Sequence, residues 1–185
     1  MNELLIRTPR LDLVAATFEH VEAELQSRAA LSRLLGADVP PGWPPGEYDR
    51  AAQEFFRGRL VALGPAVVGW LTWYAVARAP TGARGTLVAG AGFLGPPASG
   101  SVEIGYSVVP AARGRGYATE AVGALVAFAF EHAEVDEVVA HTSDDNPAST
   151  RVLLRCGFQR FGPGTEPSSV EYRRGRSASS PFRAQ

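Results

Sequence analysis

Two arginines and two glycines stand close together in the stretch SVVPAARGRGYATEA, Ser107 to Ala121, between an apolar run and an alanine-rich helical pattern. Glycine tolerates positive φ and lets another group approach the main chain, so Gly114 and Gly116 can form a loop open to a ligand. The helix that follows begins with N–H groups that have no partner inside the helix. Such amides, with the helix dipole and nearby arginine side chains, favour a phosphate or pyrophosphate. The stretch therefore predicts an anion site made largely of backbone.

Two standard phosphate-binding motifs fit this loop poorly. The Walker motif ends in Gly-Lys-Ser/Thr, and no lysine lies near the loop. The dinucleotide-binding fingerprint follows the first strand of a βαβ unit, whereas a predicted antiparallel meander precedes this loop. A glycine turn with solvated arginines is the alternative interpretation for the loop taken alone.

Composition is typical of an ordinary globular protein. The chain has 185 residues, 45% hydrophobic and 20% charged, which suits one domain with a sizeable core. A net charge of -1 provides no bulk field for nucleic acid or membrane. The N-terminus lacks the apolar core of a signal peptide, and the longest apolar run, Ala66–Ala77, is too short to cross a bilayer. We therefore expect a cytoplasmic protein without a nucleic-acid partner, a membrane partner or a bound metal.

The elements that must position the loop follow from periodicity and from turn and cap residues. They are a strand at 10–15, a helix at 18–35 capped by Thr17, a proline loop at 39–46, a helix at 47–63, strands at 66–78, 86–95 and 101–109, a helix from 116, a strand at 135–142, a helix at 147–156 and two short final strands. Residues 1–173 are predicted to form a single α+β domain. Residues 174–185 are predicted to be a mobile tail because they have too little apolar content to pack.

Several stretches, in order along the chain, resemble the GNAT superfamily of N-acetyltransferases. Arg113-Gly-Arg-Gly116-Tyr-Ala118 matches the family motif Gln/Arg-x-x-Gly-x-Gly/Ala, with EIGYSVVP before it and ATEA after it. NPASTRVLLRCGF follows the next strand, and the opening RTPRLDL is similar to the first strand of the Rim-type subgroup, the ribosomal-protein N-terminal acetyltransferases. The matching stretches extend over about residues 7–158.

The resemblance implies a three-layer α+β fold, in which helices flank a mixed, twisted sheet splayed into a V, with acetyl-CoA lying in the opening. Val108 and Val109 would pair with the pantetheine arm through their backbone, as an added strand does. Asn146 would hydrogen-bond the pantetheine, although a helix cap before a proline is the alternative for this residue. Ser149 would lie near the cofactor sulfur. The pyrophosphate would be held by Arg113, Gly114, Arg115, Gly116, Tyr117, Ala118 and Thr119.

The implied reaction, acetyl transfer to an amine, needs a base for the amine and a proton for the departing thiolate. Glu103 is the first candidate base because it lies on the strand expected to form the cleft; a partly exposed strand glutamate, or one paired with a nearby arginine, is the alternative. His141 is a second candidate. Leu153 occupies the position of the tyrosine donor of many family members, so Ser149, typical of the Rim-type subgroup, is the candidate acid, with an ordinary helix serine as the alternative. The resemblance also implies that a backbone N–H group around Val108 would stabilise the oxyanion.

The sequence thus predicts an acetyl-CoA-dependent N-acetyltransferase that acts on a protein N-terminus or a small primary amine by direct attack in a ternary complex. A non-catalytic acyl-CoA-binding module is the alternative, because the loop is better defined than the acid and base. Family analogy also suggests a homodimer. Cys156 and Glu120 are expected to be structural, and Trp43 is a candidate for the wall of the acceptor pocket.

Overall fold

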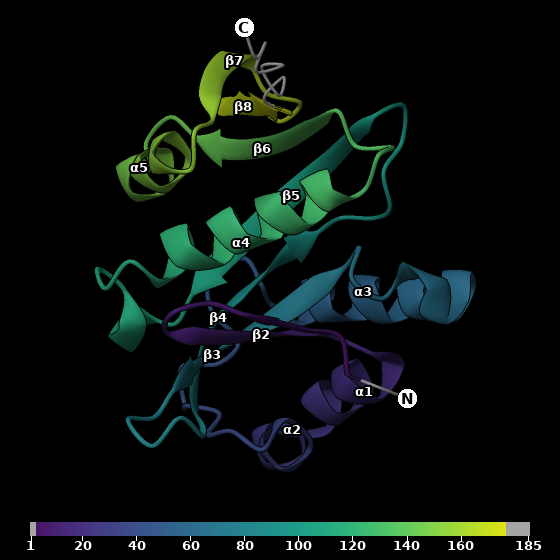
Figure 1. The fold of residues 1–185 in the computed structure, drawn as a ribbon, viewed down its shortest axis with the longest axis vertical. Coiled ribbons are helices and arrows are strands. Elements are labelled where there is room, and N and C mark those ends of the chain that lie inside the picture. Colours follow the sequence, from purple (N-terminus) through teal and green to yellow (C-terminus); the bar gives the residue numbers. More distant parts are fainter. Residues whose placement is uncertain (1–2, 177–185) are drawn as a thin grey trace, which may run out of the picture.

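The computed structural model describes residues 3–176, which form one eight-stranded sheet with helices on both faces (Figure 1). The strand order is β1-β2-β3-β4-β5-β6-β8-β7. The strands are β1 (Leu5–Arg7), β2 (Leu11–Ala15), β3 (Thr72–Arg78), β4 (Arg84–Phe93), β5 (Ser101–Val108), β6 (Glu137–Ser143), β7 (Gln159–Pro163) and β8 (Ser169–Gly175). The helices are α1 (Phe18–Gln26), α2 (Arg28–Leu35), α3 (Arg50–Leu63), α4 (Tyr117–Glu131) and α5 (Pro147–Arg155), with short 3₁₀ turns at Gly64–Val67 and Pro110–Ala112.

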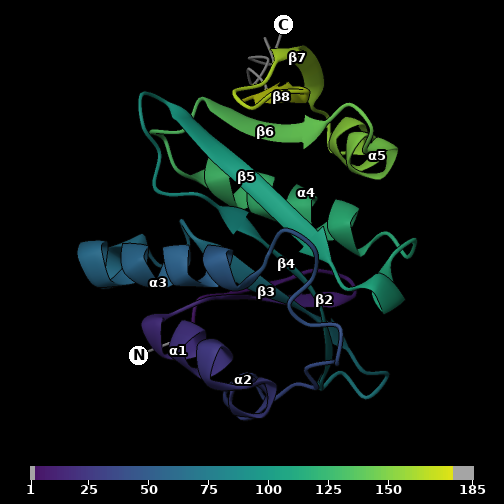
Figure 2. The same cartoon turned by 180° about the vertical axis from the view of Figure 1, so that it is seen from behind.

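The sheet splits between its two central strands, β5 and β6. Residues Ser101–Glu103 pair in parallel with Glu137–Val139, after which the two strands diverge. The other paired strands of the described chain are antiparallel. In Figure 2, β5 and β6 start close together and separate toward α5 on one side and the beginning of α4 on the other. The predicted fold class, an α+β fold with a mixed, V-splayed sheet, is confirmed.

Adjacent residues of β3 show how the sheet separates two helical layers. The ring of Trp73 lies 5.3 Å from that of Phe128 on α4, whereas the Tyr74 hydroxyl donates to Glu24 on α1 at 2.7 Å. Successive side chains of a strand point to opposite faces, so α4 covers one face and α1 the other. Trp73 is fully buried and Trp70 is 8% exposed, which confirms that both belong to the core.

The single helix predicted for residues 18–35 is wrong, because α1 and α2 are separate helices. Ser27 between them is extended (φ -172°, ψ 156°), and its hydroxyl accepts a hydrogen bond from the Ala30 amide at 3.1 Å. Serine competes with the helical backbone in this way, which makes it a better cap than an interior residue. Thr17 caps α1 as predicted, since its hydroxyl accepts from the His20 amide.

The C-terminal segment is ordered further than the sequence indicated. The tail was expected to start at Arg174, but β8 continues through Gly175. The Arg176 side chain then donates to the carbonyls of Phe130 and His132, at the end of α4, and of Val135. The remaining tail residues, 177–185, lie outside the described range. Within residues 3–176, no helix has the length and apolar character needed to span a membrane.

Candidate functional site

Strand β5 has open backbone groups where it separates from β6. The Val109 amide donates to the Val88 carbonyl at 2.9 Å, which fixes the register of this end of β5 against β4. In an antiparallel ladder, alternate residues direct their main-chain groups to the same neighbour. The N–H and C=O groups of Tyr106 and Val108 therefore face away from β4, into the gap left by β6.

Val109 does not have the free backbone groups expected of it. Its amide is bonded to β4, its carbonyl accepts from the Ala112 amide at 2.8 Å, and the residue is 3% exposed. Val108 keeps the expected orientation, and its carbonyl accepts from Arg113 Nε at 3.1 Å. Tyr106, which the motif did not single out, is the second residue of β5 with main-chain groups toward the gap. Which residues of β5 direct their main-chain groups toward the gap depends on how β5 pairs with β4, and the motif alone does not specify that pairing.

The glycine loop follows directly from this strand. Gly114 and Gly116 have φ values of +74° and +79°, as their predicted role in an open turn requires. The N–H groups of Tyr117–Thr119 lie in the first turn of α4, where the helix itself provides no acceptor for them. No side chain caps α4 either, so these N–H groups remain open to a ligand. The exposed residues Arg113 and Arg115 alternate with the two glycines. The predicted anion-binding residues are thus brought together at the start of one helix.

Asn146 and Ser149 lie on the opposite side of the gap, at the start of α5. The Asn146 side-chain oxygen accepts from the Ser149 amide at 3.1 Å, so the helix-cap interpretation of Asn146 is confirmed. This bond uses Oδ1 and leaves the Nδ2 group to donate elsewhere. Ser149 in turn contacts β5: its Oγ lies 2.7 Å from the Tyr106 hydroxyl, and its carbonyl lies 3.1 Å from the same oxygen. The Tyr106–Ser149 pair connects the two arms of the V.

The Tyr106 hydroxyl is held as a neutral donor. Burial raises the pKa of Tyr106 to about 12, although the hydrogen bond with Ser149 opposes the rise. A neutral phenol has a single proton to donate. When that proton goes to Ser149 Oγ, the nearer of the two acceptors, the serine's own proton is free to point into the gap. Tyr106 can therefore orient Ser149.

Both candidate bases meet where β5 and β6 part. His141 Nδ1 lies 2.9 Å from Glu103 Oε1, and the side chains are 18% and 41% exposed, respectively. On the other side of the imidazole, Nε2 lies 3.6 Å from Glu171 Oε2, and Glu171 pairs with Arg173. The glutamate is therefore paired with a histidine, where the sequence had suggested an arginine as the alternative partner.

A buried carboxylate anchors the proline loop, residues 36–49, on the face that carries α1. Glu24 is 7% exposed and accepts hydrogen bonds from Trp43 Nε1 (2.6 Å), Tyr48 (2.9 Å), Tyr74 (2.7 Å) and Gln53 (3.0 Å). Burial raises the pKa of Glu24, while these hydrogen bonds act in the opposite direction. Trp43 itself is only 5% exposed, so its side chain is packed inside the protein and does not line an open pocket.

The anchored loop lies against the ends of β4 and β5. Ser107 on β5 donates to the Pro45 carbonyl at 2.8 Å. A Cβ atom placed on Gly90 of β4 would lie 3.4 Å from Trp43, and one placed on Gly42 would lie 3.4 Å from Val109. The absence of side chains at these glycines allows the loop to approach the open end of β5.

Cys156 and Leu153 have packing roles. Cys156 is 6% exposed, its thiol donates to the Thr119 carbonyl at 3.4 Å, and burial raises its pKa, all of which disfavour a reactive thiolate. Leu153 is fully buried. Among residues 3–176, no three His, Cys, Asp or Glu side chains are grouped so that they could hold a metal ion.

Comparisons with known proteins match this architecture. The family model described as "Acetyltransferase (GNAT) domain" matches residues 3–159. The chain is 28% identical over 156 residues to the uncharacterized N-acetyltransferase YjdG of Bacillus subtilis, covering 84% of this chain and 89% of the relative. A putative ribosomal-protein-serine acetyltransferase from Vibrio cholerae has a TM-score of 0.63 at 22% identity, over 94% of this chain and 98% of that one. The microcin C7 self-immunity acetyltransferase MccE, solved with acetyl-CoA and AMP, has a TM-score of 0.61 at 16% identity, over 91% and 94% of the two chains.

Proposed function

The chain belongs to the GNAT family of acetyltransferases, and from that premise we propose that it transfers the acetyl group of acetyl-CoA to a primary amine. The proposed acceptor is a protein N-terminus, in keeping with the Rim-type resemblance, or a small-molecule amine. The amine attacks directly in a ternary complex. The observation that carries the proposal is the gap between β5 and β6, where open backbone leads straight into the glycine loop and α4.

The residues around the gap suit the successive parts of acetyl-CoA. The open main-chain groups of Tyr106 suit the pantetheine arm, whose amides can pair with a free strand edge. Of Val108, the N–H group faces the gap at the thioester end of that arm, while its carbonyl accepts from Arg113. The loop Arg113–Thr119 supplies free amides and two guanidinium groups for the pyrophosphate. The Nδ2 group of Asn146, left free by the helix cap, can donate to a pantetheine carbonyl.

The proposed reaction divides proton transfer between the two arms of the V. Acetyl-CoA, when bound, supplies the acetyl group as a thioester. The amine nitrogen forms a bond to the acetyl carbon, the carbon–sulfur bond breaks, the amine proton goes to Glu103 and the thiolate receives a proton from Ser149. Glu103 then gives its proton to water and Ser149 takes one from water, so that the carboxylate and the hydroxyl are both restored for the next turnover. The N–H group of Val108 faces the gap and would donate to the thioester oxygen as negative charge develops there.

Glu103 is the proposed base because of its accessibility and its partner. Its side chain is 41% exposed at the point where β5 and β6 part, so an amine, or a water between them, can reach it. The His141 side chain is less exposed, and its Nδ1 atom already lies 2.9 Å from Glu103 Oε1. When His141 carries its proton on Nδ1, the imidazole donates to Glu103 Oε1 and can hold the carboxylate in place.

Ser149 is the proposed acid, and Tyr106 is its proposed positioning residue. The serine lies in the first turn of α5, opposite the open edge of β5, and its hydroxyl is 2.7 Å from Tyr106. Because Tyr106 stays neutral over the physiological range, it can keep donating to Ser149 throughout the reaction. A homodimer is proposed from family analogy alone, and the cytoplasmic location expected from the sequence stays a proposal.

The test measures release of free thiol from acetyl-CoA with a panel of amines and N-terminal peptides. Glu103→Gln should lower turnover by about 100-fold, most strongly at low pH, where the acceptor amine is protonated, and should retain acetyl-CoA affinity. Glu137→Gln is the matched control on β6, since Glu137 pairs with Arg173 at 3.5 Å and has no proposed catalytic role. Full activity of the Glu103 variant across the pH range would remove Glu103 as the base.

The donor assignment has a separate test. Arg113→Ala combined with Gly116→Val should abolish acetyl-CoA binding while the protein stays folded, because valine is strained at the φ of +79°. Unchanged affinity would contradict the pyrophosphate assignment. Tight acetyl-CoA binding by the unaltered protein without turnover on any acceptor would favour a non-catalytic acyl-CoA-binding module.

A further inference from the structure

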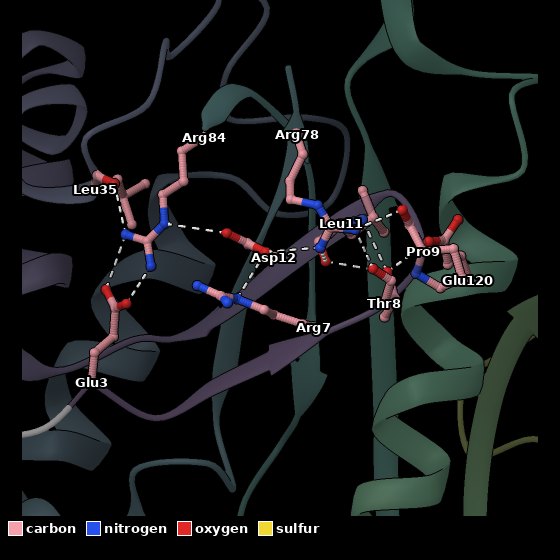
Figure 3. Close-up of polar contacts among 10 residues, drawn as sticks. All are labelled: Glu3, Arg7, Thr8, Pro9, Leu11, Asp12, Leu35, Arg78, Arg84 and Glu120. Carbon is pink, nitrogen blue, oxygen red and sulfur yellow. Dashed lines mark hydrogen bonds and ion pairs between the residues drawn. The ribbon is translucent and has the colours of Figure 1, made fainter. Parts of the chain in front are cut away.

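The turn between β1 and β2 is fixed on one side by Arg78 of β3. This guanidinium donates to the carbonyls of Thr8 and Pro9, each at 2.6 Å, and to that of Leu11 at 3.2 Å. It also pairs with Asp12 at 3.1 Å. Figure 3 shows Arg78 directed at the turn across β2. These three carbonyls of the turn are thus held in place by one side chain.

Glu120 fixes the same turn from the opposite side. One carboxylate oxygen accepts from the Thr8 hydroxyl (2.6 Å) and the Arg10 amide (2.8 Å), and the other accepts from Arg10 Nε (2.7 Å). In Figure 3 Glu120 reaches the turn from α4, on the side away from Arg84. Desolvation raises the pKa of Glu120, but hydrogen bonds from Thr8 and Arg10 outweigh it, so the pKa lies below its usual value. Glu120 is therefore ionised at neutral pH and binds the turn as a carboxylate.

The fixed turn directs Arg10 at the glycine loop. Arg10 Nη1 donates to the Arg115 carbonyl at 2.8 Å, and its guanidinium carbon lies 4.8 Å from the centre of the Tyr117 ring. A Cβ atom placed on Gly116 would be 3.4 Å from Arg10 Nη2. Arg10 therefore packs against the loop on the side of the Arg115 carbonyl.

Fixing that carbonyl also fixes an amide. The peptide unit is planar and trans, so the C=O of Arg115 and the N–H of Gly116 point in opposite directions. When Arg10 holds the carbonyl on its own side, the Gly116 N–H points away from Arg10. Along the chain this N–H directly precedes the free amides of Tyr117–Thr119 that begin α4.

We propose that Arg10 is a positioning residue for pyrophosphate recognition, acting through the Arg115–Gly116 peptide. This inference rests on the proposed function, because it assigns to the loop the pyrophosphate of acetyl-CoA. It explains why RTPRLDL and ATEA, more than a hundred residues apart in the chain, occur together: Thr8 and Arg10 come from the first stretch and Glu120 from the second. A loop set in this way needs less ordering when the ligand binds.

The experiment compares two acetyl donors that differ in the pyrophosphate. Acetyl-CoA contains it, and acetyl-pantetheine does not. Arg10→Ala should raise the KM for acetyl-CoA about tenfold, and should leave the KM for acetyl-pantetheine and for the acceptor unchanged. Arg10→Lys keeps the charge but cannot bind Glu120 and the Arg115 carbonyl through a planar fork, so it should show an intermediate rise. Arg7→Ala is the matched control, since Arg7 lies in the same hairpin with its side chain 73% exposed.

The melting temperature separates positioning from a general loss of structure. If Arg10→Ala raises the KM for acetyl-CoA and for acetyl-pantetheine equally and also lowers the melting temperature, the inference is overturned. If Arg10→Ala does not fold, the same ratio of the two KM values is measured for Arg10→Lys. An unchanged acetyl-CoA KM in Arg10→Ala, while Arg113→Ala still weakens binding, would overturn the inference and leave the proposed function standing. If Arg113→Ala also has no effect, the pyrophosphate assignment and the inference fail together.

Discussion

The proposed donor side, which would bind acetyl-CoA, and the cluster of side chains around Glu24 are built in opposite ways. The donor side is one continuous stretch, Tyr106–Thr119, whose main-chain groups are left open at a strand edge and at a helix start. The Glu24 cluster gathers side chains from α1, the proline loop, α3 and β3 around Glu24, which is buried and fully hydrogen-bonded. One region leaves polar groups free for a ligand, and the other satisfies them internally. An anion site can therefore be formed by the backbone of one short stretch, whereas a buried hydrogen-bonded cluster requires side chains from distant parts of the chain to meet.

The largest effect should come from breaking the Glu24 cluster at its centre. Glu24→Ala removes the acceptor of four buried donors, and each buried donor left unpaired costs about 1–3 kcal/mol. The free energy of unfolding in urea should fall by at least about 3 kcal/mol. Acetyl-CoA affinity, measured under conditions in which the variant stays folded, should change little because the donor side uses none of these side chains.

Glu22→Ala is the control for that prediction. Glu22 is on the same helix, is 44% exposed and pairs with Arg57 at the surface, so its loss should cost less than about 1 kcal/mol. Equal losses in the two variants, or a large loss of acetyl-CoA affinity in folded Glu24→Ala, would contradict the separation of the two regions.

The pH dependence of stability sharpens the same contrast. Burial places the pKa of Glu24 in the folded protein above its usual value of 4.5. Its contribution to stability is therefore full below pH 4.5 and is lost as the pH rises through the folded-state pKa. Glu24→Gln is neutral throughout and lacks this loss, so the stability difference, unaltered protein minus variant, should decrease from pH 4.5 upward. A difference that increases with pH would show that hydrogen bonds to the carboxylate outweigh its burial.

A smaller effect should come from the contact that joins the two arms of the V. Tyr106→Phe removes the hydrogen bond to Ser149, and kcat should fall about tenfold, the equivalent of about 1.4 kcal/mol. The KM for acetyl-CoA and the KM for the acceptor should not change, since the backbone of residue 106 is unchanged. With the pKa near 12, this tyrosine should add no alkaline limb to the rate profile at physiological pH. Tyr172→Phe is the control, because its hydroxyl contacts Thr150 of α5 only at 3.5 Å.

The smallest effect should come from the hydrogen bond that ties the proline loop to β5. Ser107→Ala removes the bond to the Pro45 carbonyl, and the free energy of unfolding should fall by about 1 kcal/mol or less. The KM for the acceptor should rise about threefold through a looser loop, while the KM for acetyl-CoA should not change. A rise in the acetyl-CoA KM of the same size would show that the loop serves both sides.

Much of the fold could be predicted because it depends on local patterns. The alternation in β2, the cap at Thr17, the prolines of the loop and the apolar surface of α4 each indicate an element without knowledge of its neighbours. The helix break at Ser27 was missed because apolar spacing continues across it, whereas serine's hydroxyl caps the second helix. The extension of β8 was missed because distant carbonyls accept from its Arg174 and from Arg176 just after it: Arg174 donates to Cys156, and Arg176 donates to Phe130 at the end of α4 and to Val135.

The sequence by itself determined where the donor loop lies, since Gly114 and Gly116 permit the positive φ angles found there and a helix start leaves its amides free wherever it occurs. Tertiary structure alone decided that Tyr106, in place of Val109, has main-chain groups facing the gap, and that Glu103 meets His141. It also brought Arg10 to the Arg115 carbonyl. The physical reason is the distance along the chain over which each feature is decided. The allowed backbone dihedrals depend on one residue and its neighbours, whereas the meeting of two distant side chains depends on the pairing of the strands between them.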